Sequence, residues 1–339
     1  GRHEIIDFLK NNKKLMTGLD NSSLFFSTAS IDNLHFIKDR SLDVLMNFRQ
    51  INDMRRLNEY LIACHAKIIP GGYLIGNFKP MDSLYGEFRR IMPKFLFIII
   101  YPIHFLFYRV FPKLPKIRHL YFVMTKGRNR VISKAEVFGR LNYCGYKFIA
   151  EKMIDSTLYF VAQKLSTIST EEAPSYSPIV NLKRVGLDGK IITIHKFRTM
   201  HPYSEFIQKE LFENHNLNPS GKIKDDFRIT NWGKVMRSLF IDELPQLYDW
   251  FQGKLKIVGV RALSEHYFSL YPEDLKKERI KQKPGLVPPY YTDMPRSFEE
   301  ILDSERRYLT KKDDNPLTTD VVYFWNGLIN ILFHGARSS

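Results

Sequence analysis

Short apolar runs alternate with polar and amphipathic stretches over roughly the first half of the chain. The runs that predict buried strands are brief, and they lie at 23–29, 41–48, 71–78 and 119–125. Two stretches have the spacing of helices: 53–69, and 133–145, opened by Ser133 and closed by Gly145. A pair of strands is expected at 146–153 and 157–164. The pattern as a whole predicts a mixed α/β fold.

The sharpest hydrophobic feature is Phe95–Tyr108, a run of 14 residues without Asp, Glu, Lys or Arg. As a straight helix it would rise about 21 Å, which is less than the roughly 30 Å of a hydrocarbon core. Pro102 should bend this helix, and the basic residues on both flanks should stay on one membrane face. We therefore expect a re-entrant, monotopic hairpin at 93–116, and its expected membrane residues are Phe95, Ile99, Pro102, Phe105 and Phe107. A buried core helix is the alternative.

A second apolar cluster lies at 321–333, near the end of the chain. Its spacing predicts a helix, and Trp and Tyr within it suit the boundary between water and lipid. A helix lying in the headgroup layer and a helix packed on the C-terminal domain both fit this pattern.

The net charge of the chain narrows the classes of partner that it could bind. The 339 residues include 51 Lys and Arg against 36 Asp and Glu, a net charge of +15. This excess favours phosphorylated substrates and the anionic lipid of an inner leaflet. Nucleic acid is not expected, because the chain lacks zinc-ligand spacing, RNA-binding aromatic motifs and a low-complexity basic tail. Two cysteines without a pairing pattern fit the reducing, cytoplasmic side of a membrane.

Against this basic background, Asp242 and Glu243 stand side by side in RSLFIDELPQL. Pro245 suits the first position of a helix, which would set both carboxylates just ahead of the positive helix end. That position favours ionised carboxylates, and an ionised carboxylate can attack phosphorus. An acidic pair by itself would more often be a solvated helix start, so the surrounding motifs decide its meaning.

Those motifs run in order from Ser177: SPIVNLKRVGLDGKIITIHKFRTM, then DDFRITNWGKVMRSLFIDELPQLYDWFQGKLKIVGVR, then KQKPGL. Together they resemble the bacterial sugar transferase family, the monotopic polyprenyl-phosphate phosphoglycosyl transferases. The resemblance implies an α+β catalytic domain at the cytoplasmic face of the bacterial inner membrane. It also implies transfer of a phosphosugar from a nucleotide diphosphate sugar, such as a UDP-sugar, to undecaprenyl or another polyprenyl phosphate, which initiates glycan or exopolysaccharide assembly.

By the same resemblance, Asp242 is the nucleophile that forms a phospho-aspartate, and Glu243 with Asp242 holds Mg²⁺. Phosphoryl transfer also needs cations aimed at the phosphate oxygens. The candidates for that role are Lys196, Arg198, Arg228, Arg237, Arg261 and Lys283. Alternation along 190–199 puts Lys196 and Arg198 on one strand face. Asp225 and Asp226 are alternative partners for Arg228, and His195 receives no role.

The N-terminal half has a weaker likeness. PGGYLIG followed by SKAEVFGRLNYCGYKF resembles the later part of a class I methyltransferase, although the only glycine between Arg2 and Pro70 is Gly18. Such enzymes hold their cofactor over a glycine-rich loop, so we expect a non-methylating scaffold. A generic Rossmann-like spacer is the alternative. The expected domains are a Rossmann-like domain at 1–165 with the inserted hairpin, a linker at 166–176 and a catalytic domain at 177–339.

Several positions depart from the sugar transferase pattern. The chain has GVRA where the family usually has GPRP, and VPPYYTDMPRSFEE follows KPGL in place of a Gly-Trp segment and Asn-Gly-Arg. These departures leave two further hypotheses: a non-catalytic membrane scaffold for glycan enzymes, and a methyltransferase acting on a lipid-linked glycan. The sequence leaves open the donor sugar and whether the chain forms a homo-oligomer.

Overall fold

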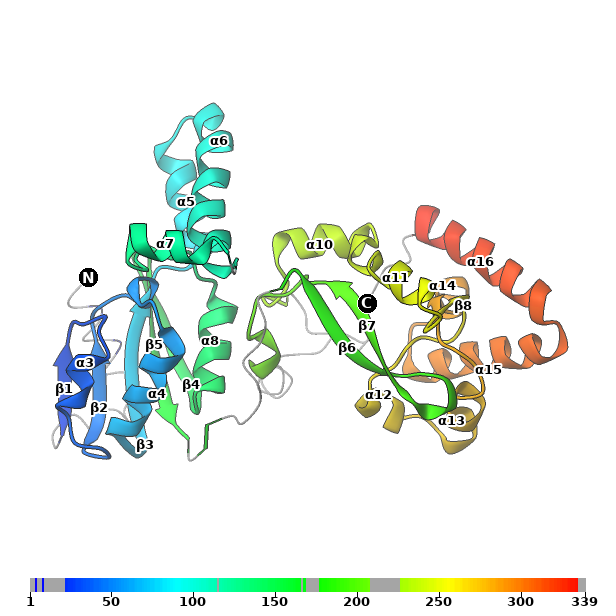
Figure 1. The fold of residues 1–339 in the computed structure, drawn as a ribbon, viewed down its shortest axis with the longest axis horizontal. Coiled ribbons are helices and arrows are strands. Elements are labelled where there is room, and N and C mark those ends of the chain that lie inside the picture. Colours follow the sequence, from blue (N-terminus) through cyan, green and yellow to red (C-terminus); the bar gives the residue numbers. More distant parts are fainter. Residues whose placement is uncertain are drawn as a thin grey trace. The chain divides into compact units, whose positions relative to one another are not determined.

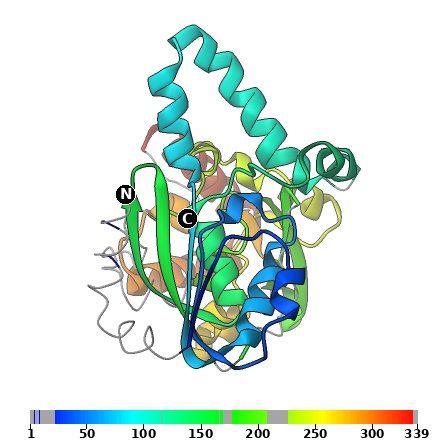
Figure 2. The same cartoon turned by 90° about the vertical axis from the view of Figure 1, so that its left-hand side faces the viewer.

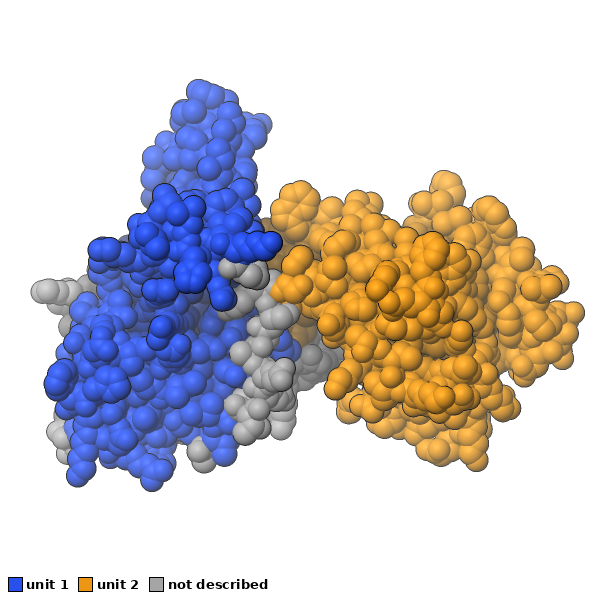
Figure 3. Space-filling view, in the orientation of Figure 1, with its two compact units in different colours: residues 1–176, 201–210 blue, residues 177–200, 211–339 orange. Residues whose placement is uncertain are grey.

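The structure is a computed structural model, and it describes residues 4, 8, 22–114, 116–165, 167, 168, 177–207 and 226–334. The chain forms two compact units, coloured separately in Figure 3. Unit 1 comprises residues 1–176 and 201–210, and unit 2 comprises residues 177–200 and 211–339.

Unit 1 is built on a mixed sheet in the order β1-β2-β3-β5-β4 (Figure 1). Its strands are β1 (Ser23–Phe26), β2 (Leu42–Asn47), β3 (Ile68–Phe78), β4 (Tyr146–Ile154) and β5 (Thr157–Lys164). The first three strands are parallel, and β5 is antiparallel to β3 and β4. Parallel strands need crossover connections, and α3 (Asp32–His35), a 3-10 turn (Ile51–Asp53) and α4 (Leu57–Lys67) lie in them.

Helix α8 (Lys134–Tyr143) leads into β4 and begins as predicted. The Ser133 hydroxyl accepts a hydrogen bond from the backbone N–H of Glu136, which satisfies one of the free donors of the first turn. Gly145, with φ of +84°, follows the helix end. The core beneath these elements consists of fully buried apolar side chains that include Val44, Ile75, Leu141, Phe160 and Val161. The mixed α/β fold is confirmed.

The most hydrophobic segment forms one limb of a helical pair, seen at the top of Figure 2. Helix α5 (Met81–Ile91) is followed by α6 (Lys94–Phe105), and π-helical (Leu106–Val110) and 3-10 (Phe111–Lys113) turns continue α6. The helical run Lys94–Lys113, 20 residues long, is the one stretch within the described ranges whose length and composition would let it cross a membrane. Pro102 lies inside α6, which stays helical to Phe105, and the chain reverses at Met92 and Pro93, at the start of the predicted hairpin 93–116. The re-entrant hairpin stays a prediction.

Aromatic packing explains why this run stays helical through Pro102. The ring of Tyr85 on α5 lies 5.1 Å from that of Tyr101, and the ring of Phe88 lies 4.8 Å from that of His104. The helix then widens into the π-helical turn, a common way to accommodate a lost backbone hydrogen bond. Outward-facing apolar side chains include Phe95, Ile98, Ile99 and Ile103, whereas the ring of Phe107 turns inward and lies 5.4 Å from that of Tyr121.

The strand predicted at 119–125 is wrong, because these residues form helix α7 (Arg118–Thr125). Tyr121 is buried, while Leu120, Val123 and Met124 are exposed. A strand with one buried face would bury every second side chain, and this pattern does not occur here. The helix ends where Lys126 and Gly127 adopt left-handed backbone angles, with φ of 52° and 79°.

Unit 2 begins with the antiparallel hairpin of β6 (Ile179–Val185) and β7 (Ile191–Phe197), joined by a 3-10 turn (Leu187–Gly189). Next come α10 (Asn231–Ser238), a 3-10 turn (Ile241–Glu243), α11 (Gln246–Phe251) and β8 (Lys256–Val258), which pairs in parallel with β9 (Gly285–Val287). The remaining helices are α12 (Glu265–Ser269), α13 (Glu273–Arg279), α14 (Tyr290–Asp293), α15 (Phe298–Asp314) and α16 (Pro316–Phe333).

The core of unit 2 gathers Val258, Leu263, Tyr271, Leu275 and Tyr308. The predicted C-terminal helix is confirmed as α16, which turns Tyr323 and Gly327 inward. Its other face leaves Val321, Trp325 and Leu332 exposed.

The domain boundary predicted at 177 needs one correction. Residues 201–207, expected in the catalytic domain, belong to unit 1. Their 3-10 turn (Ser204–Ile207) packs on α8, and the rings of Tyr143 and Phe206 lie 5.1 Å apart. Hydrophobic patterning alone does not reveal such an excursion, because the segment is short.

Candidate active site around Asp242

Asp242 and Glu243 lie in the short 3-10 turn between α10 and α11. The turn begins after Phe240, whose φ of 58° is left-handed, and the backbone N–H of Glu243 donates to the Phe240 carbonyl at 3.2 Å. Pro245 was predicted as the first helical residue, and it stands one position ahead of α11, with a helical φ of −59°. The local backbone therefore resembles the prediction, although α11 is only six residues long.

Asp242 is buried, with 4% of the residue exposed, and its Oδ1 atom has no hydrogen-bond partner among the described residues. Burial raises the pKa of this carboxyl group, against the opposing effects of Lys196 and Arg237, while Glu243 raises it further. The expectation that the helix end favours an ionised Asp242 is therefore wrong, because burial raises the pKa of this carboxyl group by more than Lys196 and Arg237 lower it. The Oδ1 atom of Asp242 is therefore a buried acceptor without a hydrogen-bond donor among the described residues.

Glu243 has a direct partner on the neighbouring hairpin. The Lys196 ammonium lies 2.6 Å from Glu243 Oε1, and both side chains are 18% exposed. This pair ties the acidic turn to strand β7.

Strand β7 is held against α11 by a fully buried carboxylate, Asp249. The backbone N–H of His195 donates to Asp249 Oδ2 at 2.7 Å, and the His195 ring Nδ1 lies 2.8 Å from Oδ1. Lys254 is a third partner, at 3.4 Å. His195, which received no role from the sequence, thus helps to fix the strand that presents Lys196.

Two of the predicted arginines lie on or just before α10. Arg237 donates from Nε to the Thr199 hydroxyl at 3.0 Å, and burial lowers its pKa while Asp242 and Asp226 oppose that effect. Arg228 pairs with Asp226 at 2.7 Å, and Asp226 has a pKa below its usual value because this pairing outweighs its burial. The alternative role of Asp226 as a partner of Arg228 agrees with this geometry, and Asp225 lies outside the described residues.

Arg261 is surrounded by phenol rings. Its guanidinium carbon lies 5.6 Å from the centre of the Tyr290 ring. Tyr290 raises the pKa of Arg261 against burial, with further contributions from Tyr291 and Glu243. Tyr291 is buried, and its ring lies 5.3 Å from that of Phe240, two residues before Asp242.

The structure brings together six of the eight predicted catalytic and phosphate-binding residues through these contacts and charge interactions: Asp242, Glu243, Lys196, Arg228, Arg237 and Arg261. Arg198 instead donates from Nε to the Ser177 carbonyl at 3.0 Å. Lys283 is exposed, and a Cβ placed on Gly253 would lie 3.7 Å from its ammonium. Neither of these two contacts involves Asp242.

Sequence reasoning missed Thr199, Asp249, Tyr290 and Tyr291 as parts of this site. Thr199 lies within the quoted HKFRTM motif, but a hydroxyl residue next to two cations gave no separate signal. The two tyrosines lie in VPPYYTD, which was noted only as a departure from the family pattern.

The predicted Mg²⁺ can be tested against the donor atoms. Among the described residues, no group of three or more His, Cys, Asp or Glu side chains could hold a metal ion. Mg²⁺ is commonly bound by one or two carboxylates together with substrate phosphates, so it does not need such a cage. Asp242, with its unpartnered oxygen, and Glu243 are two suitable carboxylates and fit an ion of this kind.

Comparison with known proteins identifies a family that matches this chain. A family model described as Bacterial sugar transferase matches residues 154–333, more than half of the chain. The relatives include Galactosyl transferase CpsE of Streptococcus agalactiae, 32% identical over 39% of this chain and 30% of that protein. Undecaprenyl-phosphate galactose phosphotransferase of Salmonella typhimurium is 34% identical over 31% of this chain and 23% of its own length. The chain thus spans less than a third of either relative.

Among solved structures, a SAM dependent methyltransferase from Archaeoglobus fulgidus is similar to 48% of this chain and 95% of that one, with 11% identity and a TM-score of 0.28. A likeness of this size carries no argument, so the methyltransferase-like character of unit 1 stays a prediction.

Proposed function

Because the chain belongs to the bacterial sugar transferase family, we propose that it transfers a phosphosugar from a UDP-sugar to undecaprenyl phosphate or a similar polyprenyl phosphate. The observation that carries this proposal is the buried Asp242 carboxylate, which lies next to Glu243 in sequence. The positive charges of Lys196 and Arg237 lower its pKa and so favour its ionised form. An acidic nucleophile within a set of cations suits attack on a diphosphate, whose negative oxygens the cations neutralise. The product would be a polyprenyl diphosphate sugar that begins glycan assembly.

The reaction would proceed by two displacements. An oxygen of the Asp242 carboxylate attacks the phosphorus that carries the sugar, and the bond from that phosphorus to the bridging oxygen breaks, releasing UMP. An oxygen of the polyprenyl phosphate then attacks the same phosphorus, and the Asp242 carboxylate leaves unchanged. Arg237 and Arg261 are suited to the phosphate oxygens because guanidinium groups donate paired hydrogen bonds to them.

Asp242 and Glu243 would hold Mg²⁺, and this ion would neutralise the diphosphate of the donor. Glu243 also keeps Lys196 next to the acidic turn, at 2.6 Å. Lys196 is therefore suited to lowering the pKa of Asp242 until the donor phosphates enter.

The membrane placement belongs to the same proposal. Helices α6 and α7 carry exposed apolar side chains, among them Ile98, Ile99, Leu120 and Val123. The net charge of +15 favours an anionic leaflet. We place the protein as a monotopic enzyme at the cytoplasmic face of the bacterial inner membrane, with anionic lipid as a partner.

The test is to incubate the purified protein with a set of UDP-sugars, Mg²⁺ and undecaprenyl phosphate, and to measure UMP. We expect one or a few donors to give turnover, and Asp242→Asn to lower it by about 10³-fold or more. Asp188→Asn is the matched control, because that carboxylate is 64% exposed on a hairpin loop. Without acceptor, wild-type protein should retain labelled phosphosugar after denaturation.

Full turnover by Asp242→Asn would overturn the covalent mechanism. Binding of UDP-sugar or Mg²⁺ without turnover of any donor would favour the non-catalytic scaffold. A rise in melting temperature with S-adenosylmethionine would favour the methyltransferase hypothesis, which the missing glycine loop argues against.

A further inference from the structure

The helices α5 and α6 form the hairpin at the top of Figure 2, and the outer sides of the two helices differ in polarity. On α6, exposed apolar side chains recur every three or four residues, so they form a stripe along one face. Tyr101 and His104 of the same helix turn toward α5, so the stripe points away from it. The α6 stripe consists of Phe95, Ile98, Ile99, Ile103 and Leu106, which are between 47% and 68% exposed.

The outer face of α5 is polar. Its exposed residues include Asp82, Gly86, Arg89 and Arg90, which lie three or four positions apart and therefore share one side of the helix. The two arginines belong to the last turn of α5, and the exposed Lys94 begins α6 after the reversal of the chain. The end of the hairpin that lies away from the sheet thus carries three cations (Figure 1).

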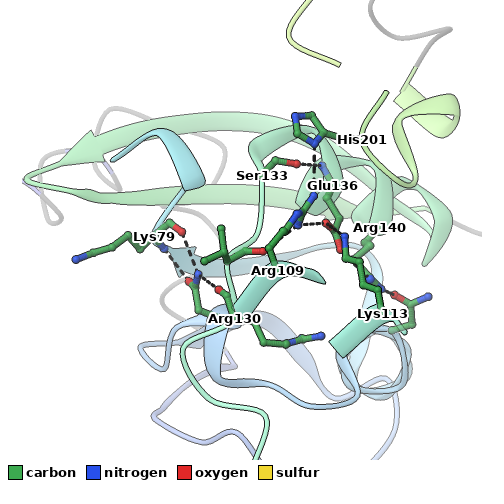
Figure 4. Close-up of polar contacts among 11 residues, drawn as sticks. Lys79, Arg109, Lys113, Arg130, Ser133, Glu136, Arg140 and His201 are labelled. Carbon is green, nitrogen blue, oxygen red and sulfur yellow. Dashed lines mark hydrogen bonds and ion pairs between the residues drawn. The ribbon is translucent and has the colours of Figure 1, made fainter. Parts of the chain in front are cut away.

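The other end of the hairpin is anchored in unit 1. Arg109 and Lys113, in the last part of the helical run, pair with the buried carboxylate of Glu136 on α8 (Figure 4). Burial raises the pKa of Glu136, but the surrounding cations hold it well below its usual value, so the carboxylate is ionised. These contacts leave Phe95–Tyr108 available to a bilayer. As a helix this stretch rises about 21 Å, less than the roughly 30 Å of a hydrocarbon core.

Insertion of this hairpin into the hydrocarbon core would carry charges with it. If the reversal entered first, its three cations would lie deepest, where charged side chains are costly. Glu87 of α5 would follow, and the hydrogen bond that it accepts from Lys79 at 2.8 Å lowers its pKa and keeps it ionised at neutral pH. Asp82, on the outer face, would meet lipid tails directly. The charge pattern therefore disfavours a hairpin that enters the core.

We propose that the α5–α6 hairpin lies along the surface of an anionic bilayer, with the α6 stripe against the acyl chains and the outer face of α5 in water. Amphipathic elements with Lys and Arg on their polar side bind such surfaces in this orientation. Lys94, next to the stripe, can extend its side chain to a lipid phosphate. A second copy of the chain is the less suitable occupant, because its net charge of +15 would repel the first. The inference rests on the membrane placement in the proposed function and specifies it.

The first test measures the depth of single nitroxide labels in vesicles of phosphatidylglycerol and phosphatidylcholine. Phe95→Cys, Ile99→Cys and Ile103→Cys place labels along the stripe, and the access of oxygen and of a water-soluble nickel complex to each label gives its depth. A hairpin lying on the surface predicts three depths that agree within about 5 Å, roughly one helical turn. A hairpin inserted end-on predicts a steady change of about 12 Å from position 103 to position 95, because a helix rises about 1.5 Å per residue. Such a gradient would overturn the proposal.

The second test compares two cysteines on opposite sides of the hairpin. Ile99→Cys lies on the stripe, and Gly86→Cys lies on the outer face of α5, where an added Cβ meets no neighbouring atom within 4 Å. With vesicles, a water-soluble maleimide should react at least about tenfold more slowly with Ile99→Cys, and within about twofold of its rate in buffer with Gly86→Cys. Equal protection of the two thiols would contradict the proposed orientation.

The native cysteines should not interfere with either test. Cys64 and Cys144 are fully buried, and burial raises the pKa of each thiol to about 12. The thiolate is the reactive form, so both should react slowly with the label and the maleimide.

Two other outcomes concern the occupant of the stripe. Spin–spin broadening of the Ile99→Cys label without vesicles would show that a second copy covers the stripe, and it would overturn the proposal. Failure of the wild-type protein to bind vesicles would overturn the membrane placement together with this inference. A depth gradient in bound protein would overturn the inference alone. Because neither test contains donor or acceptor, both stand apart from the Asp242→Asn measurement of transfer.

Discussion

The buried oxygen of Asp242 should cost the folded protein stability. It has no hydrogen-bond partner in the described part of the chain, and burying such an acceptor costs about 1–3 kcal/mol. We predict that Asp242→Asn raises the free energy of unfolding by about 1 kcal/mol or leaves it unchanged, because the buried charge is removed. Urea denaturation at pH 7 measures this difference.

Asp226, whose carboxylate is paired with Arg228, should respond to the same substitution in the opposite direction from Asp242. Asp226→Asn removes the charge partner of Arg228, which is 6% exposed, and should lower the free energy of unfolding by about 1–3 kcal/mol. If Asp242→Asn were the more destabilising of the two changes, Asp242 would have a structural role and the interpretation of its oxygen as a free nucleophile would fail.

The pH dependence of turnover should report on Asp242. Its pKa is raised by burial, and the attacking form is the carboxylate, so kcat/KM should fall as the pH drops through that raised pKa. Lys196 lowers the pKa of Asp242, so Lys196→Met should move the acidic limb to higher pH. The measurement is UMP release between pH 4 and 9. An acidic limb that stays in place, or moves to lower pH, would argue against Asp242 as the titrating group.

Much of this side-chain arrangement could be predicted because charged residues stand out in ordered motifs. The approach of Lys196 to Glu243 joins β7 to a turn more than 40 residues later, and both were named in advance. Tyr290 and Tyr291 could not be found in this way, because buried phenol rings are ordinary core residues in a sequence. Their importance comes from the Tyr290 ring next to Arg261 and from the effect of both tyrosines on the pKa of Arg261, which only the folded chain reveals.

The helices α6 and α7 carry exposed apolar side chains that should contact lipid. Leu120 and Val123 on α7 are 63% and 74% exposed, and burying each such side chain stabilises by about 1.5–3 kcal/mol. We predict that the double variant Leu120→Asn, Val123→Asn reduces binding to lipid vesicles by at least about tenfold. Co-sedimentation with vesicles is the measurement.

Phe36, which is 91% exposed after α3, is the matched control. Phe36→Asn removes a similar apolar surface from a different part of unit 1 and should leave vesicle binding unchanged. Equal losses in both variants would mean that exposed apolar area in general, and not α7, governs association.

Elements with a regular pattern were predicted well, and those with an irregular one were not. The strands of the unit 1 sheet and helices α4 and α8 follow local signals, including the Ser133 cap. Helix α7 was mistaken for a strand because a short apolar run has no period to decide the matter. The reversal at Met92 and Pro93 was not predicted, because the rings that hold α5 on α6 depend on tertiary packing.

The net charge of +15 should make the proposed membrane association depend on salt. Electrostatic attraction is screened over about 10 Å at 0.1 M salt and about 3 Å at 1 M. We predict that binding to phosphatidylglycerol vesicles weakens as NaCl rises, while binding to neutral phosphatidylcholine vesicles changes little. Identical salt dependence for both lipids would show that charge has no part in docking.

The sequence analysis placed a domain boundary at residue 177, and it did not predict that residues 201–207 belong to unit 1. The segment is fixed by a close approach to Gly139 and by single contacts from Asn58 and Arg140. None of these contacts produces a repeated sequence pattern. The sequence alone therefore assigns the segment to the catalytic domain, which contains the residues before and after it. Long-range contacts of this kind require coordinates.

The pairing of Gly139 with Tyr203 also limits how such proteins can be recombined. A chimera that joins this N-terminal half to the transferase half of a distant relative would bring a foreign loop against the bare helix face at Gly139. Transferring residues 201–207 together with α8 would keep Tyr203 next to Gly139. These two stretches must therefore be exchanged together, although they are far apart in the gene.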